Sequence, residues 1–117
     1  MTPAFFHETA LALPGVTFDV KWGNDGVFSV GKMFAVYGPI DSADARYSFK
    51  ASDIAFEMLI EQGLAIPAPY MARAKWVQLA HADALCDAEV AAYLREGHAL
   101  VAAKLTRKVR AELGLEA

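Results

Sequence analysis

The 117-residue sequence predicts a single α+β domain, residues 1–117, built around an antiparallel sheet. Four short segments of strand character follow one another between residues 17 and 50, with glycine-rich turns between them. Segments with helical periodicity come before and after these strands. Apolar residues make up 56% of the chain and charged residues 21%, a composition that suits one packed core and argues against disorder.

A helix is expected over residues 3–13, and Pro14-Gly15 ends it. The period of the apolar residues then changes from about four to two. Phe18, Val20 and Trp22 alternate with polar residues, which predicts a strand that buries these three side chains. A glycine-rich hairpin turn follows this strand.

Three further strands complete a predicted antiparallel meander. They are expected at residues 27–30, 33–37 and 46–50. In the last of them, alternation places Tyr47 and Phe49 on the buried face. Arg46, Ser48 and Lys50 fall on the other face, which is either an ordinary solvated surface or a binding surface.

The next segment has the start and stop signals of a helix. Ser52 is expected to cap it by accepting a free amide hydrogen of the first turn, and Gly63 is expected to end it. Ile54, Met58 and Leu59 supply its apolar side.

The remainder of the chain predicts one more strand and a helical tail. Residues 65–69 contain two prolines and are expected to form an extended connector, with a short turn at residues 70–72. A fifth strand is predicted at residues 75–79. Residues 87–113 are expected to be helical, with Gly97 breaking the tail into a short and a longer helix.

Charge is distributed unevenly along the chain. The net charge is −3, yet residues 95–117 hold five basic and three acidic residues, while residues 1–94 hold six basic and eleven acidic ones. A basic face of this kind can contact phosphates, although the acidic remainder opposes a large electrostatic footprint. The sequence has no apolar run that would span a bilayer and no basic signal-peptide start, so we expect a soluble cytoplasmic protein.

Several short motifs together resemble the MmcQ/YjbR family of small bacterial proteins over nearly the whole chain. The matching segments are Leu13–Val16, Trp22-Gly23, Val30–Ala35, Phe49–Ser52, Pro67–Met71, Lys75–Val77 and Val101–Leu105. The resemblance implies a CyaY-like α/β sandwich, in which a five-stranded antiparallel sheet carries helices on one face. It also implies DNA binding through a double-wing arrangement of hairpins.

The chain departs from this family pattern at two places. Family members often have glycine before the tryptophan, where this chain has Lys75, so a positive charge is added beside the predicted wing strand. They often have Ser-Tyr in the tail helix, where this chain has Gly97-His98. A function that needs a hydroxyl in the tail is therefore not expected here.

The candidate nucleic-acid-binding residues are the cations of the wing strand and tail, with one tryptophan and one strand lysine. They are Arg73, Lys75, Trp76, Lys104, Arg107, Lys108 and Lys50. The cations would hold backbone phosphates while Trp76 stacks on a base. The competing interpretation makes the tail cations the solvated face of an amphipathic helix whose apolar stripe begins at Val101, and makes Trp76 a core residue.

No cofactor, metal site or catalytic group is predicted. Asp53, Glu57 and Glu61 form a carboxylate stripe, which is interpreted as a solvated face rather than an iron site of the frataxin kind. The three histidines are far apart, and Cys86 is expected to be a small buried side chain. We therefore expect a non-enzymatic module that binds DNA weakly, without sequence specificity and in a salt-sensitive way. The alternative is a protein-interaction or small-ligand module, either one a monomer or weak dimer.

Overall fold

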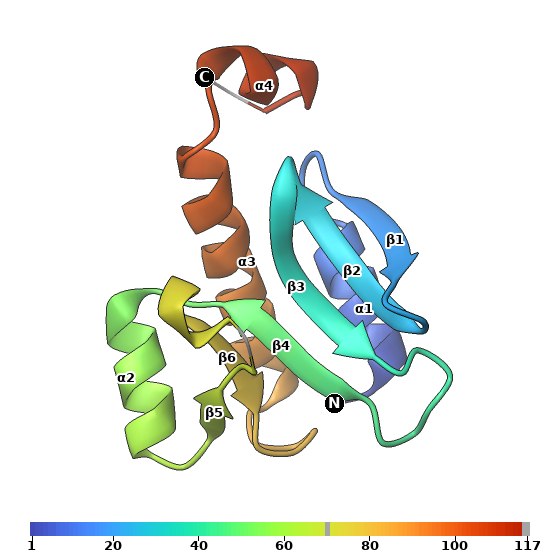
Figure 1. Ribbon diagram of the computed structural model, residues 1–117, viewed down its shortest axis with the longest axis vertical. Coiled ribbons are helices and arrows are strands. Elements are labelled where there is room, and N and C mark those ends of the chain that lie inside the picture. Colours follow the sequence, from blue (N-terminus) through green and yellow to red (C-terminus); the bar gives the residue numbers. More distant parts are fainter. Residues whose placement is uncertain (70, 116–117) are drawn as a thin grey trace.

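The computed structural model describes residues 1–69 and 71–115, and in this part of the chain six strands form one antiparallel sheet (Figure 1). The strands are β1 (Thr17–Lys21), β2 (Asp25–Val30), β3 (Lys32–Gly38), β4 (Arg46–Lys50), β5 (Ala65–Pro67) and β6 (Trp76–Leu79). Their order across the sheet is β1-β2-β3-β4-β6-β5. The helices are α1 (Pro3–Leu11), α2 (Asp53–Glu61), η1 (Ala72–Ala74), α3 (Asp87–Ala103) and α4 (Arg107–Glu112).

Helices α1 and α3 cover one face of the sheet, behind it in Figure 1, and the other face is open. This confirms the predicted α+β class with helices on one face. The core lies between these layers and is rich in aromatic rings. Phe6 of α1 is fully buried and meets Phe28, Tyr37 and Tyr47 at ring-centroid distances of 5.1–6.1 Å. Such edge-on and tilted contacts are the favoured geometries for aromatic pairs.

The sheet has one strand more than predicted. Residues 65–67, expected to be an unpaired connector, form β5 at the sheet edge, where Ala65 lies opposite Leu79 and Pro67 opposite Val77. Proline is tolerated there because an edge strand does not need every N–H group for the ladder. The predicted turn at residues 70–72 includes Tyr70, which lies outside the described residues.

Two predictions of buried side chains are wrong, although the elements themselves form. Trp22 is 64% exposed because β1 ends at Lys21 and Trp22 lies in the turn that follows, and Val20, near the end of this edge strand, is 48% exposed. In α2, Ile54 is 80% exposed and Met58 40% exposed, while Ala55 and Leu59 are buried. Helix α2 stands beside β5 at the margin of the sheet, so only a narrow stripe of it meets the core (Figure 1).

Gly97 does not break the tail helix; it lies buried inside α3, which continues to Ala103. A Cβ at this position would lie 2.7 Å from the carbonyl oxygen of Lys50. Glycine is therefore required by the close approach of the helix to β4, and the helix continues because its own hydrogen bonds are intact. The break occurs instead at Lys104, the C-cap residue that follows α3, and Thr106 caps α4 by accepting from the Val109 N–H at 3.2 Å.

Candidate nucleic-acid interface

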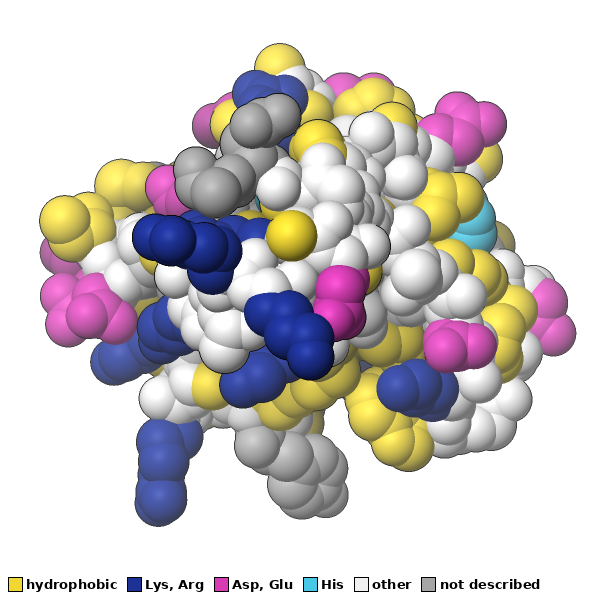
Figure 2. Space-filling model, turned by 90° about the horizontal axis from the view of Figure 1, so that it is seen from above, with side chains coloured by type: hydrophobic (Ala, Val, Ile, Leu, Met, Phe, Trp, Pro, Cys, Tyr) yellow, Lys and Arg dark blue, Asp and Glu magenta, His cyan; other side chains and the backbone are white. Residues whose placement is uncertain are grey.

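Five cations meet in a surface hollow between the end of β4, η1 and the C-terminal end of α3, which we call the basic pocket. Its charged lining consists of Lys32, Lys50, Arg73, Lys75 and Lys104, together with the single acid Asp53. The hollow has a volume of about 430 Å³. Seen from above, Lys and Arg side chains gather on one part of the surface (Figure 2).

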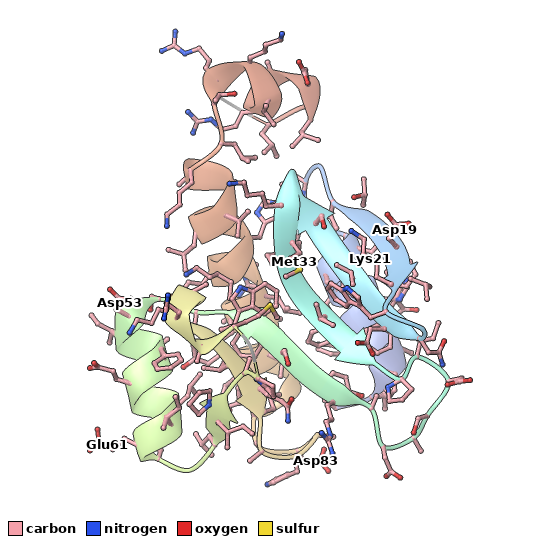
Figure 3. All side chains as sticks on the ribbon, in the orientation of Figure 1. Asp19, Lys21, Met33, Asp53, Glu61 and Asp83 are labelled. Atoms are coloured by element: carbon pink, nitrogen blue, oxygen red, sulfur yellow. The ribbon has the colours of Figure 1, made fainter. Side chains whose placement is uncertain are left out.

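Four different elements bring these charges together. Lys32 begins β3, Lys50 ends β4, and Arg73 lies in η1, with Lys75 directly after it. Lys104 is the C-cap residue that follows α3. The carboxylate comes from Asp53, the first residue of α2, which lies at the end of that helix nearest to η1 (Figure 3).

Lys50 is half-buried in the pocket. Its Nζ donates to the backbone carbonyl of Ala74, which ties β4 to the end of η1. Burial, and after it the ammonium group of Lys104, holds the pKa of Lys50 below its usual value, against the opposing effect of Asp53. The pocket thus has a surplus of positive charge that an incoming anion would relieve.

Lys75 has a left-handed backbone, with a φ angle of 64°. This is the conformation that glycine adopts without steric conflict, which accounts for the glycine expected at this position from the family pattern. The Lys75 Nζ lies over the ring of Phe56, 4.9 Å from its centroid. The chain therefore accepts an unfavourable backbone conformation at a residue that adds charge to the basic pocket.

Trp76 is only 4% exposed, so it is not available to stack on a base as the functional hypothesis required. It lies opposite Lys50 in the sheet and lines the floor of the basic pocket. The segment before it folds back over β6, because the Ala68 N–H donates to the Trp76 carbonyl at 3.0 Å and the Trp76 N–H donates to the Met71 carbonyl at 3.2 Å.

The structure separates the predicted tail cations into two groups. Lys104 lines the basic pocket, but Arg107 and Lys108 are exposed on α4, which is not part of the pocket lining. The tail cations do not form one face of a single helix, because α3 ends and α4 begins between Lys104 and Arg107. Lys32 was missed, although in an antiparallel meander the start of one strand lies beside the end of the next, and this places Lys32 near Lys50.

A second hollow, of about 460 Å³, lies on the open face of the sheet, and we call it the apolar hollow. Its apolar lining comes from Trp22, Val36, Ala68, Pro69 and Met71. Three polar side chains, Asp25, Ser48 and Gln78, complete it. A largely apolar concavity with a few hydrogen-bonding groups is typical of ligand sites.

The other polar candidates have structural surroundings. His7 Nδ1 lies 3.0 Å from the Tyr37 hydroxyl, and His98 Nε2 donates to the Pro14 carbonyl at 2.7 Å. Cys86 is exposed rather than buried, because it caps the start of α3, where its N–H donates to Glu89 at 3.1 Å. Within residues 1–69 and 71–115, no three His, Cys, Asp or Glu side chains come together as metal ligands, and no helix has the length and apolar character to cross a bilayer.

Comparisons with known proteins agree on the kind of domain. The family model described as YjbR matches residues 11–100. Among solved structures, the chain is similar to protein DR2400 of Deinococcus radiodurans, whose domain is assigned to the family DUF419. The TM-score is 0.84 at 23% sequence identity, and the match covers 98% of this chain and 89% of that one, so the likeness shows the fold. No curated protein matches the sequence.

Proposed function

This chain belongs to the YjbR family, and we propose that it binds the phosphates of nucleic acid through the basic pocket. The observation that carries the proposal is the convergence of five cations from four elements on one hollow that contains a single carboxylate. Surface lysines are usually interspersed with acids, and the chain as a whole is acidic. A concentration of one sign of charge in a concave site is the electrostatic arrangement that attracts a polyanion.

The pocket is suited to contacts with the backbone rather than with base edges. Lysine ammonium groups act as point charges that neutralise phosphates, and Arg73 adds a planar donor that can engage two phosphate oxygens. Such contacts position a nucleic acid but carry no sequence information. Binding is therefore expected to be weak, in the micromolar range, and independent of sequence.

Salt dependence measures the number of phosphates that are neutralised. If three or four cations each neutralise one phosphate of a duplex, raising the salt concentration fourfold lowers the affinity roughly 40- to 150-fold. We would titrate a labelled random duplex and a random single strand, at about 50 and about 200 mM salt, and follow fluorescence anisotropy. An absence of binding at the lower salt concentration would overturn the proposal.

Two double variants distinguish the basic pocket from the rest of the basic surface. Arg73→Glu/Lys104→Glu reverses two exposed charges of the pocket, and Arg107→Glu/Lys108→Glu makes the same change in net charge on α4. The first variant should remove most of the affinity and flatten the salt dependence, while the second should bind nearly as the wild type does. Equal losses in both would mean that binding follows net charge and not the pocket.

A second candidate function is favoured by the apolar hollow, which has the size and lining of a small-ligand or peptide site. The salt dependence of the affinity distinguishes this function from phosphate binding, because an apolar contact is nearly insensitive to ionic strength. A ligand whose affinity is unchanged by salt and by the Arg73→Glu/Lys104→Glu variant would support this alternative.

A further inference from the structure

We infer that the basic pocket and the apolar hollow form one track that takes single-stranded nucleic acid, with an unstacked base in the hollow and a neighbouring phosphate in the pocket. This inference rests on the proposed phosphate contact and specifies the kind of nucleic acid.

The two hollows are consecutive on one face of the same strands. Ser48 and Gln78 lie opposite each other and line the apolar hollow. Lys50 and Trp76 are the next opposing pair on that face, and they line the basic pocket. A step of two residues along a strand is about 7 Å, so the two sites are separated by roughly the size of one nucleotide.

The apolar hollow is suited to a base and unsuited to a phosphate. Trp22 is 64% exposed, so its ring is available for stacking, which is tolerant of sequence because every base has a π-face. The Asp25 carboxylate repels phosphate but accepts hydrogen bonds from exocyclic amino groups of bases. The Gln78 amide can both donate to and accept from a base edge.

Each of the two hollows is lined by one non-glycine residue with a left-handed backbone. Among the described residues, Trp22 and Lys75 are the two non-glycine residues with positive φ, at 51° and 64°. One lines the apolar hollow and the other the basic pocket. Bulky residues avoid this conformation, and where it persists it often accompanies a binding function.

A duplex cannot use this track, because its bases are paired and stacked and present only their edges. The comparison that tests the inference is therefore between a single-stranded oligodeoxynucleotide of about ten residues and an abasic oligonucleotide of the same length, which keeps the phosphates and lacks the bases. The wild type should bind the single strand about tenfold more tightly than the abasic strand. Trp22→Ala should lower single-strand affinity to the abasic level and leave abasic affinity unchanged.

Controls keep the failure of this inference apart from failure of the proposed function. Ile54→Ala removes a side chain that is 80% exposed on α2 and lines neither hollow, and it should change neither affinity. Equal affinity of the wild type for the two strands, with loss of both in Arg73→Glu/Lys104→Glu, would overturn the base site and keep the phosphate site. Tighter binding of a duplex than of the single strand would also overturn the inference. No binding of either strand would overturn both.

Discussion

The left-handed backbone at Lys75 leads to a prediction in which two small substitutions at the same residue have different effects. Lys75→Ala keeps the unfavourable φ of 64°, whereas Lys75→Gly relieves it. The left-handed conformation costs an L-residue about 1–2 kcal/mol, and glycine loses about 0.5–1 kcal/mol more than alanine in chain entropy on folding. Lys75→Gly should therefore be more stable than Lys75→Ala by about 0.5–1 kcal/mol.

Both variants remove the same charge and the same contact with the Phe56 ring, so these losses cancel in the comparison. Urea denaturation at equilibrium measures the difference in the free energy of unfolding. Nucleic-acid affinity should fall equally in the two variants, with the salt slope reduced by about 0.9 as one phosphate contact is lost. Equal affinities together with unequal stabilities would separate the backbone effect from the charge effect.

Lys104 provides the matched control, since it lines the same pocket but has a right-handed backbone, with φ −90°. Glycine at this helix end should be less stable than alanine by up to about 1 kcal/mol, which is the opposite sign. If Lys75→Ala proves as stable as Lys75→Gly, the left-handed conformation does not exist in solution, and the explanation for the family glycine fails with it.

Five other substitutions test features of the fold. Gly97→Ala should destabilise the protein by about 1–2 kcal/mol in urea denaturation, because the added Cβ would lie 2.7 Å from a backbone oxygen and overpacking outweighs the gain in helix propensity. In the same assay Leu59→Ala should cost about 2–5 kcal/mol and Ile54→Ala less than about 0.5 kcal/mol, since they are 1% and 80% exposed. Ser52→Ala should cost about 1 kcal/mol, seen as a lower Tm, through loss of the 3.1 Å cap bond; an unchanged Tm would contradict it. The pKa of Lys50 is lowered in the folded chain, so the unfolded chain holds the extra proton between that pKa and 10.5. The wild type should therefore gain stability relative to Lys50→Met as the pH rises toward 10.5.

Local patterns in the sequence were sufficient for most elements of the fold. Alternation correctly placed Tyr47 and Phe49 on the covered face of β4, and the cap at Ser52 is confirmed. The two tryptophans show why such patterns have a limit. Trp22 was expected to be buried and is exposed, while Trp76 is buried under the segment before it. Periodicity predicts which residues share a face, but not which face another part of the chain covers.

The candidate site was predictable in part for the same reason. Arg73, Lys75 and Trp76 are close in sequence, so their proximity followed from local structure. Lys50 and Lys104 also lie in the pocket. Arg107, which was predicted to act together with Lys104, lies instead on α4, because α3 ends before Lys104. The position of a helix end depends on tertiary packing. The packing of Gly97 against β4 lets α3 continue to Ala103, and the sequence alone does not reveal this packing.

The two edges of the sheet differ in how they would meet another polypeptide strand. Strand β5 is three residues long and ends in Pro67, which has no N–H to donate, so extension of the sheet from this side is blocked. Strand β1 is five residues long and largely exposed, and its outward hydrogen-bonding groups are unprotected by any proline. Its charged side chains, Asp19 and Lys21, are the residues that oppose aggregation at that edge (Figure 3). Growth of the sheet by strand addition, as in a self-assembled dimer or fibre, would therefore begin at β1, and replacing these two charges with apolar residues would promote it.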